Sequence, residues 1–161
     1  MGRFGQAAVV GALGGAAGTT ALNAVTYLDM TLRARPPSST PEDTVQVMLD
    51  RAGVTLPGDE DSRRNRLSAL GALSGIATGV GVGVAASVLS TLAGRRPGSG
   101  TALALGAAAM AASDSSMTSL GVTDPRTWRA ADWAADIVPH LAYGAAAAGV
   151  LRLGAARGSA R

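Results

Sequence analysis

The 28 residues from Leu67 to Gly94, LSALGALSGIATGVGVGVAASVLSTLAG, carry no charged side chain. A helix needs about 20 consecutive apolar residues to cross the roughly 30 Å hydrocarbon core of a bilayer. The stretch exceeds that length, and Arg66 and Arg95 flank its two ends. It therefore predicts a membrane-spanning helix over 67–94.

Small residues recur within this stretch at every fourth position, which places them on one face of a helix. They are Gly71, Gly75, Gly79 and Gly83, followed by Ser87 and Thr91. In lipid, helices associate by close van der Waals contact, and small residues allow their backbones to approach. Gly11 and Gly15 repeat the spacing near the N-terminus. This glycine zipper predicts packing against another helix of the chain or against a second copy, with a pore as a further alternative.

Three other stretches resemble the first in their lack of charge. Between Arg3 and Asp29 there are 25 uncharged residues, which predict a spanning helix over 5–29, with a cleaved signal peptide as the alternative. Two weaker, Ala-rich stretches predict helices over 99–121 and 128–151. We therefore expect an all-α fold, a four-helix transmembrane bundle that forms a single integral membrane domain over 1–161.

Residues 33–66 form the one substantial polar segment, in which six Arg balance six acidic residues. Pro36 and Pro37 end the first helix, because proline lacks the amide donor. Thr40 suits an N-cap and Pro41 a first helical position, and Gly53 suits a helix end. The segment thus predicts a short amphipathic helix of about twelve residues. We expect this helix to lie on the membrane surface or to cap the bundle.

The composition excludes several classes of function. The chain has no cysteine, which excludes a disulfide scaffold, a thiol redox site and a cysteine nucleophile. Its net charge of +3, with no Lys, is too small a surplus to indicate a nucleic-acid partner. The Arg63-Arg64-Asn65-Arg66 cluster is accordingly interpreted as a lipid headgroup anchor. No serine elbow, phosphate-binding glycine loop or zinc-protease motif is present, so we expect no catalytic residues, no enzyme activity and no cofactor.

The distribution of Arg predicts the orientation. Four crossings would bring the N-terminus, the turn at 95–98 and the C-terminus to one side. These segments hold six basic residues and no acidic one: Arg3, Arg95, Arg96, Arg152, Arg157 and Arg161. The other side has eight Arg, but they are spread over longer segments with most of the acids. Positive charge in short segments marks the cytoplasmic side, so we expect both termini in the cytoplasm.

Five ionisable residues fall within or at the ends of the predicted spans: Asp29, Asp114, Asp132, Asp136 and His140. Ionisable groups within a bilayer are costly and are functional candidates by default. Asp132, Asp136 and His140 are spaced four apart and share one helix face. Carboxylate and imidazole groups can relay protons or bind a divalent cation, whose identity the residues leave unknown. The structural alternative is hydrogen bonding between helices and to headgroups.

The C-terminal third of the chain contains a distinctive set of residues, Asp124-Pro125, Trp128, Asp132-Trp133, Asp136, Pro139-His140 and Tyr143-Gly144. This set resembles a signature of small uncharacterised multi-pass membrane proteins of high-GC actinobacteria. The Gly-rich first helix followed by Arg35-Pro36-Pro37 is similar to the YagU-type inner-membrane proteins. The resemblance implies a bacterial plasma-membrane protein, and it brings no particular activity.

We therefore expect a small multi-pass plasma-membrane protein that acts as an accessory or interaction component. Its partners are the lipid bilayer and either a second copy or another membrane protein. One alternative is a proton- or cation-coupled transporter or permeation protein that uses the Asp/His cluster. Another is a membrane metalloenzyme. Convergence of Asp29, Asp114, Asp136 and His140 in space would favour these alternatives.

Overall fold

Helices make up most of residues 2–159, the part of the chain that the computed structural model describes, with side chains for residues 2–156. The elements are α1 (Arg3–Arg33), α2 (Thr40–Arg51), α3 (Glu60–Leu92), α4 (Thr101–Ser119), the 3-10 turn η1 (Pro125–Thr127) and α5 (Ala130–Ser159). Residues 2–159 contain no strand, so the prediction of an all-α fold is confirmed. The side chain of Arg157 and the whole of Arg161 lie outside the described residues.

Three helices in the described part of the chain are long and apolar enough to cross a membrane, namely α1, α3 and α5. The prediction of four such helices is therefore wrong for α4. This helix does form within the predicted range 99–121, but it has only 19 residues and ends in the polar run Ser113–Ser119. Asp114 and the serines around it lower its mean hydropathy, which the many alanines do not offset.

The longest helix, α3, begins earlier than the predicted span because a carboxylate caps it. Asp59 is the N-cap, and its Oδ1 accepts a hydrogen bond from the Ser62 N–H at 2.8 Å. The first turns of α3 thus include the predicted Arg anchor. Arg63 Nε donates to the Gly58 carbonyl at 2.8 Å, so this guanidinium folds back onto the loop before the helix.

The amphipathic helix forms at the predicted place as α2, with a one-residue correction at its start. Ser39 is the N-cap in place of Thr40, so Pro41 is the second helical residue. Gly53 ends the helix, with φ at +67°. This left-handed backbone lets the Val54 N–H reach back to the Leu49 carbonyl at 2.9 Å, which closes a glycine C-cap.

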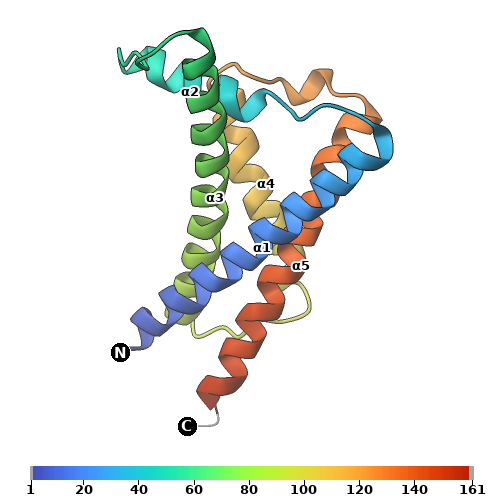
Figure 1. Cartoon of the computed structure of the whole chain (residues 1–161). Helices are drawn as coiled ribbons and strands as arrows, with labels where there is room; N and C mark the ends of the chain where they lie inside the picture. The colour runs from blue at the N-terminus through green and yellow to red at the C-terminus, as the bar shows by residue number, and fades with distance from the viewer. Residues whose placement is uncertain (1, 160–161) are drawn as a thin grey trace.

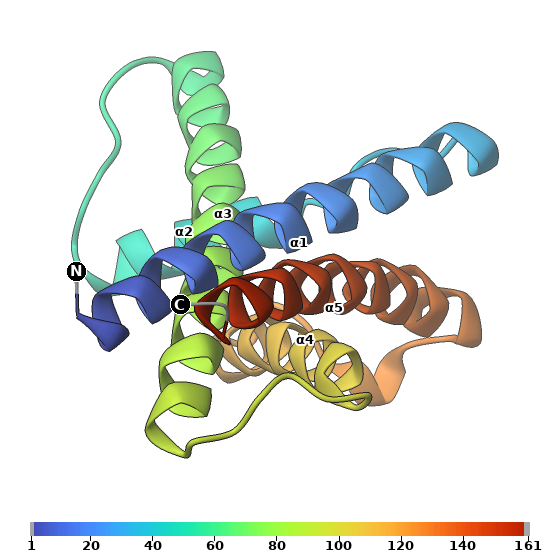
Figure 2. The same cartoon turned by 90° about the horizontal axis from the view of Figure 1, so that it is seen from below.

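The long helices run up and down between two ends of the molecule (Figure 1). α1 begins and α5 ends at one end, together with the turn between α3 and α4; we call this the terminal end. α2 lies across the start of α3 at the other end, which we call the α2 end, and the loop between α4 and α5 is there too. α1 packs most extensively, against α3 and α5, while α4 packs mainly against α5 (Figure 2).

The core is small and consists mostly of small residues. Tyr143 is the one large side chain that is fully buried among the described residues. Around it lie Leu105, Ala109, Ala147, Ala148 and Leu151. The Tyr143 hydroxyl donates a hydrogen bond of 2.6 Å to the Gly79 carbonyl and so joins α5 to α3. Many large apolar side chains instead lie on the outside of the helices.

The glycines of α1 and α3 meet where the two helices cross. A Cβ on Gly15 would lie 2.5 Å from the Gly79 carbonyl oxygen, and one on Gly83 would lie 2.6 Å from the Gly15 nitrogen. Contacts this close leave no room for any side chain. The stripe on α3 is not in contact along its whole length, because a Cβ on Gly75 would meet no atom within 4 Å. Gly71 lies against Pro41 of α2 instead.

Candidate functional site

Two glycines bring α4 and α5 into close contact next to the part of each helix that carries Asp114, Asp136 and His140. A Cβ on Gly106 would lie 2.7 Å from the His140 carbonyl oxygen, and one on Gly144 would lie 2.7 Å from the Gly106 nitrogen. The two backbones therefore touch, as small residues allow in helix pairs. This contact fixes the register of α4 against α5 and brings Asp114 to the helix face that carries Asp136 and His140.

The imidazole of His140 is held by its own helix. Its Nδ1 lies 2.8 Å from the Asp136 carbonyl oxygen and 3.3 Å from Asp136 Oδ1. A carbonyl oxygen can only accept, so Nδ1 carries the proton in this arrangement. The neutral imidazole then has its lone pair on Nε2, which can accept a proton.

The carboxyl group of Asp114 is the third member of the cluster. It lies near enough to the Asp136 carboxyl group and the His140 imidazole, both on the facing helix, to interact electrostatically with each of them. The Ser113 hydroxyl approaches it at 3.5 Å, which is too long for a strong hydrogen bond. On the other carboxyl group, Asp136 Oδ2 is buried and has no hydrogen-bond partner among the described residues. Two acidic side chains thus share a site that leaves one of their oxygens unsatisfied.

The other two predicted acids lie near the α2 end and have Arg partners. Asp29 Oδ2 accepts a hydrogen bond of 2.5 Å from Arg35 Nε, and Arg33 lies 3.5 Å from its other oxygen. Asp132 Oδ2 accepts a hydrogen bond from the Arg129 N–H at 2.9 Å, at the start of α5. Such contacts hold helix ends in place. Asp114, Asp136 and His140 therefore converge, whereas Asp29 and Asp132 do not join them.

A metal site needs several ligands at bonding distance of one point. Within residues 2–159 no group of three or more His, Cys, Asp or Glu side chains is arranged to hold a metal ion. The Asp114–Asp136–His140 cluster is included in this statement.

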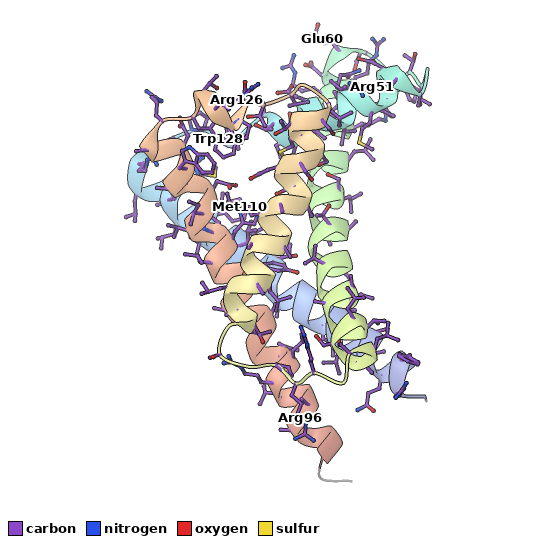
Figure 3. The ribbon with its side chains drawn as sticks, turned by 180° about the vertical axis from the view of Figure 1, so that it is seen from behind. Arg51, Glu60, Arg96, Met110, Arg126 and Trp128 are labelled. Atoms are coloured by element: carbon purple, nitrogen blue, oxygen red, sulfur yellow. The ribbon has the colours of Figure 1, made fainter. Side chains whose placement is uncertain are left out.

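The loop at the α2 end carries charge and aromatic rings (Figure 3). Asp124 caps the 3-10 turn, and hydrogen bonds from the Arg126 side chain and N–H hold the pKa of this carboxyl below its usual value of 3.8. The rings of Trp128 and Trp133 pack edge to face, with centroids 5.0 Å apart. Amphipathic rings of this kind are typical of the boundary between hydrocarbon and headgroups.

Sequence reasoning missed Tyr143 and Gly106 as residues that organise the site. Tyr143 anchors α5 to α3, and Gly106 sets the position of α4 beside His140. A signal for Tyr143 was its place beside Gly144 in an otherwise small-residue segment. No protein-family model, curated protein or solved structure matches the chain.

Proposed function

We propose that the protein is a multi-pass plasma-membrane protein of a bacterium, with four crossings and a proton-binding site between α4 and α5. The membrane location is supported by the apolar side chains on the outside of the helices. Leu13, Leu73 and Leu103 each remain about 60% exposed, at 59%, 59% and 65%. Transfer of one such side chain from water into an apolar environment is favourable by about 1.5–3 kcal/mol. The fold leaves these side chains unburied, and a surrounding lipid bilayer would supply that environment.

The up-and-down arrangement supports a crossing by α4 as well. α3 ends at the terminal end and α5 begins at the α2 end, and α4 is the connection between them (Figure 1). A chain that crosses with α3 and again with α5 in the same direction must cross back between them. The polar group that lowers the hydropathy of α4, Asp114, faces Asp136 and His140 on α5. Packing of α1 against α3 and α5 likewise supports a retained span rather than a cleaved signal peptide.

The observation that carries the proton site is the buried, unpartnered Asp136 Oδ2 beside a second carboxyl group. Two carboxylates in contact in a medium of low dielectric repel each other and share a proton instead. A proton held between Asp114 and Asp136 gives the buried oxygen its partner. The His140 ring lies beside Asp136, with Nδ1 3.3 Å from Asp136 Oδ1, and its Nε2 is a second proton acceptor, so the cluster has two places for a mobile proton. We therefore favour a proton-coupled transport or permeation component.

Infrared difference spectroscopy of the purified full chain in liposomes tests this site. A protonated carboxyl has a C=O stretch that a carboxylate lacks, so a pH step should reveal the shared proton. We expect that band in the wild type and in Asp124→Asn, and its loss in Asp114→Asn and in Asp136→Asn. A band that survives in both cluster variants would refute the proton site. Proton flux into the same liposomes should vary between about pH 5 and 8, and flat flux would refute the coupling.

The second candidate is an accessory or interaction component, which the outer face of α3 favours. Gly75 has open space around it, and Leu73 and Ile76 beside it are exposed. A partner helix, from a second copy or from another membrane protein, could approach closely there. Because the chain has no cysteine, single-cysteine variants test this in native membranes. After addition of an external oxidant, we expect disulfide-linked homodimers for Gly75→Cys and none for Leu103→Cys; equal crosslinking would count against this interface. Neither candidate function involves catalysis of a chemical reaction.

A further inference from the structure

A pocket opens at the terminal end, between the start of α1, the end of α3 and the end of α5. Its volume is about 210 Å³. Three arginines line it: Arg3 from α1, and Arg95 and Arg96 from the turn after α3. The pocket is smaller than the roughly 300–1,000 Å³ of sites for drug-sized ligands. It therefore suits one small group rather than a whole cofactor or nucleotide.

The pocket has positive charge without compensation. Within residues 2–159, none of its three guanidinium groups has a carboxylate partner, and the segments at this end contain no acidic residue. Arg3 stacks over the Phe4 ring, 4.6 Å from its centroid, which leaves its donors available. Ser87 and Ser90 add hydroxyl groups to the lining. Several arginines with neighbouring hydroxyls form a donor set that matches the oxygens of a phosphate.

The turn that carries two of the arginines is fixed at both ends. The Arg95 N–H donates to the Ser90 carbonyl at 2.9 Å and closes the glycine cap of α3. At the far side of the turn, Arg152 donates to the Gly98 carbonyl at 2.7 Å and ties the turn to α5. The backbone that carries these arginines is therefore ordered before a ligand binds, which lowers the entropy lost on binding.

One part of the pocket wall is apolar and includes Val10 and the buried side chains Ala7 and Leu151. A site for free phosphate would have no use for such a wall. The pocket also lies where three apolar helices end, at the level of the headgroups of a surrounding bilayer. The combination of a cationic rim and an apolar wall fits a molecule with a phosphate and a hydrocarbon chain.

We propose that this pocket binds the phosphate of an anionic phospholipid, with Arg3, Arg95 and Arg96 on the headgroup and the acyl chain along Val10 and Leu151. The site is separate from the Asp114–Asp136–His140 cluster and does not depend on a proton being held there. It requires only that the terminal end lies at a membrane surface. Anionic lipids in the cytoplasmic leaflet would then serve as ligands of a fixed geometry, not only as a diffuse counter-charge.

Thermal unfolding of the purified full chain in a neutral maltoside detergent tests the proposal. A ligand that binds only the folded state raises the unfolding temperature. We expect titration with phosphatidylglycerol to raise it, and phosphatidylcholine or inorganic phosphate to leave it unchanged. A shift of equal size with inorganic phosphate would overturn the lipid as the source of the phosphate. No shift with phosphatidylglycerol would overturn the site.

Variants that remove the same number of charges at different places distinguish binding in this pocket from a general attraction between the basic protein and anionic lipid. The double variant Arg95→Gln/Arg96→Gln should weaken the apparent affinity for phosphatidylglycerol by about tenfold for each guanidinium removed. The single variant Arg3→Gln, on a different element, should also weaken it about tenfold. The control Arg126→Gln/Arg129→Gln removes two exposed charges at the α2 end and should keep the wild-type affinity. Equal losses in the control, or none in the pocket variants, would overturn the proposal.

Discussion

Replacement of single glycines on α3 by alanine measures how closely α1 and α3 approach. Gly75 and Gly83 lie on the same stripe of the same helix, two turns apart. At Gly75 a methyl group would meet nothing within 4 Å, whereas at Gly83 it would lie 2.6 Å from the Gly15 nitrogen and 2.7 Å from the Gly15 Cα. These neighbours are backbone atoms, which cannot rotate away as a side chain can.

The magnitude follows from a comparison of the two variants. Each substitution gains the helix propensity of alanine over glycine, up to about 1 kcal/mol, and this gain cancels in the comparison. Only Gly83→Ala has the overpacking cost, which is typically about 1–3 kcal/mol. Because α1 must move as a whole to make room, we expect the upper part of that range. Gly83→Ala should thus be about 2–3 kcal/mol less stable than Gly75→Ala.

Denaturation of both variants in mixed micelles, followed by circular dichroism, provides the measurement. Gly75→Ala should unfold at the same denaturant fraction as the wild type or at a higher one. Gly11→Ala fills the same crossing from the other helix, so combining it with Gly83→Ala should cost less than the sum of the two. If Gly83→Ala proves as stable as Gly75→Ala, the close packing of α1 on α3 is refuted.

Three further predictions concern a buried hydrogen bond, a helix cap and the membrane orientation. Tyr143→Phe removes the buried hydrogen bond to the Gly79 carbonyl and should lower the free energy of unfolding by about 0.5–1.5 kcal/mol, while Tyr27→Phe, at an exposed position, should have no effect in the same micelle assay. The pKa of Asp59 lies below its usual value of 3.8 because Ser62 donates hydrogen bonds to the carboxylate. The helix cap should therefore be intact above pH 3.8 and be lost as the pH falls through the lowered pKa. The Ser62 amide resonance should report that loss, and Asp59→Asn, which keeps a capping oxygen, should abolish the pH dependence; a resonance with the same titration in the variant would assign it to another group. Ser38→Cys should react with an impermeant maleimide on intact cells and Ser99→Cys only after lysis, and the reverse pattern would place both termini outside.

Periodicity in the sequence predicts which residues share a helix face, but not how far along that face a neighbour extends. The four-residue spacing of glycine on α3 predicts one packing face, of which Gly79 and Gly83 contact α1. The contact region along this face depends on how α1 crosses α3 (Figure 2). α1 reaches Gly79 and Gly83 but not Gly75. That crossing is set by side chains on three helices together, so it has no local signature.

The polar cluster has the same limit. The spacing of Asp132, Asp136 and His140 predicts that they share one face of α5, yet the Asp132 carboxylate accepts a hydrogen bond from the Arg129 N–H at the helix start. The third member of the cluster is Asp114 on α4, which is distant from Asp136 and His140 in the sequence. Its position depends on the register of α4 against α5, and that register follows from the contact of Gly106 with the His140 backbone. A sequence without its tertiary contacts does not reveal such a register.

Asp114 accounts both for the weak hydropathy of α4 and for the proposed proton site. A carboxyl group in the second half of a short, Ala-rich helix makes that helix a poor span by itself. Against α5 the same carboxyl group faces Asp136, and the proposed shared proton removes most of the charge that made it costly. In the proposed arrangement with four crossings, the helix pair rather than α4 alone would be the unit that the bilayer accepts. Protonation would link membrane stability of α4 to occupancy of the site, so that a lost proton loosens the helix that holds it.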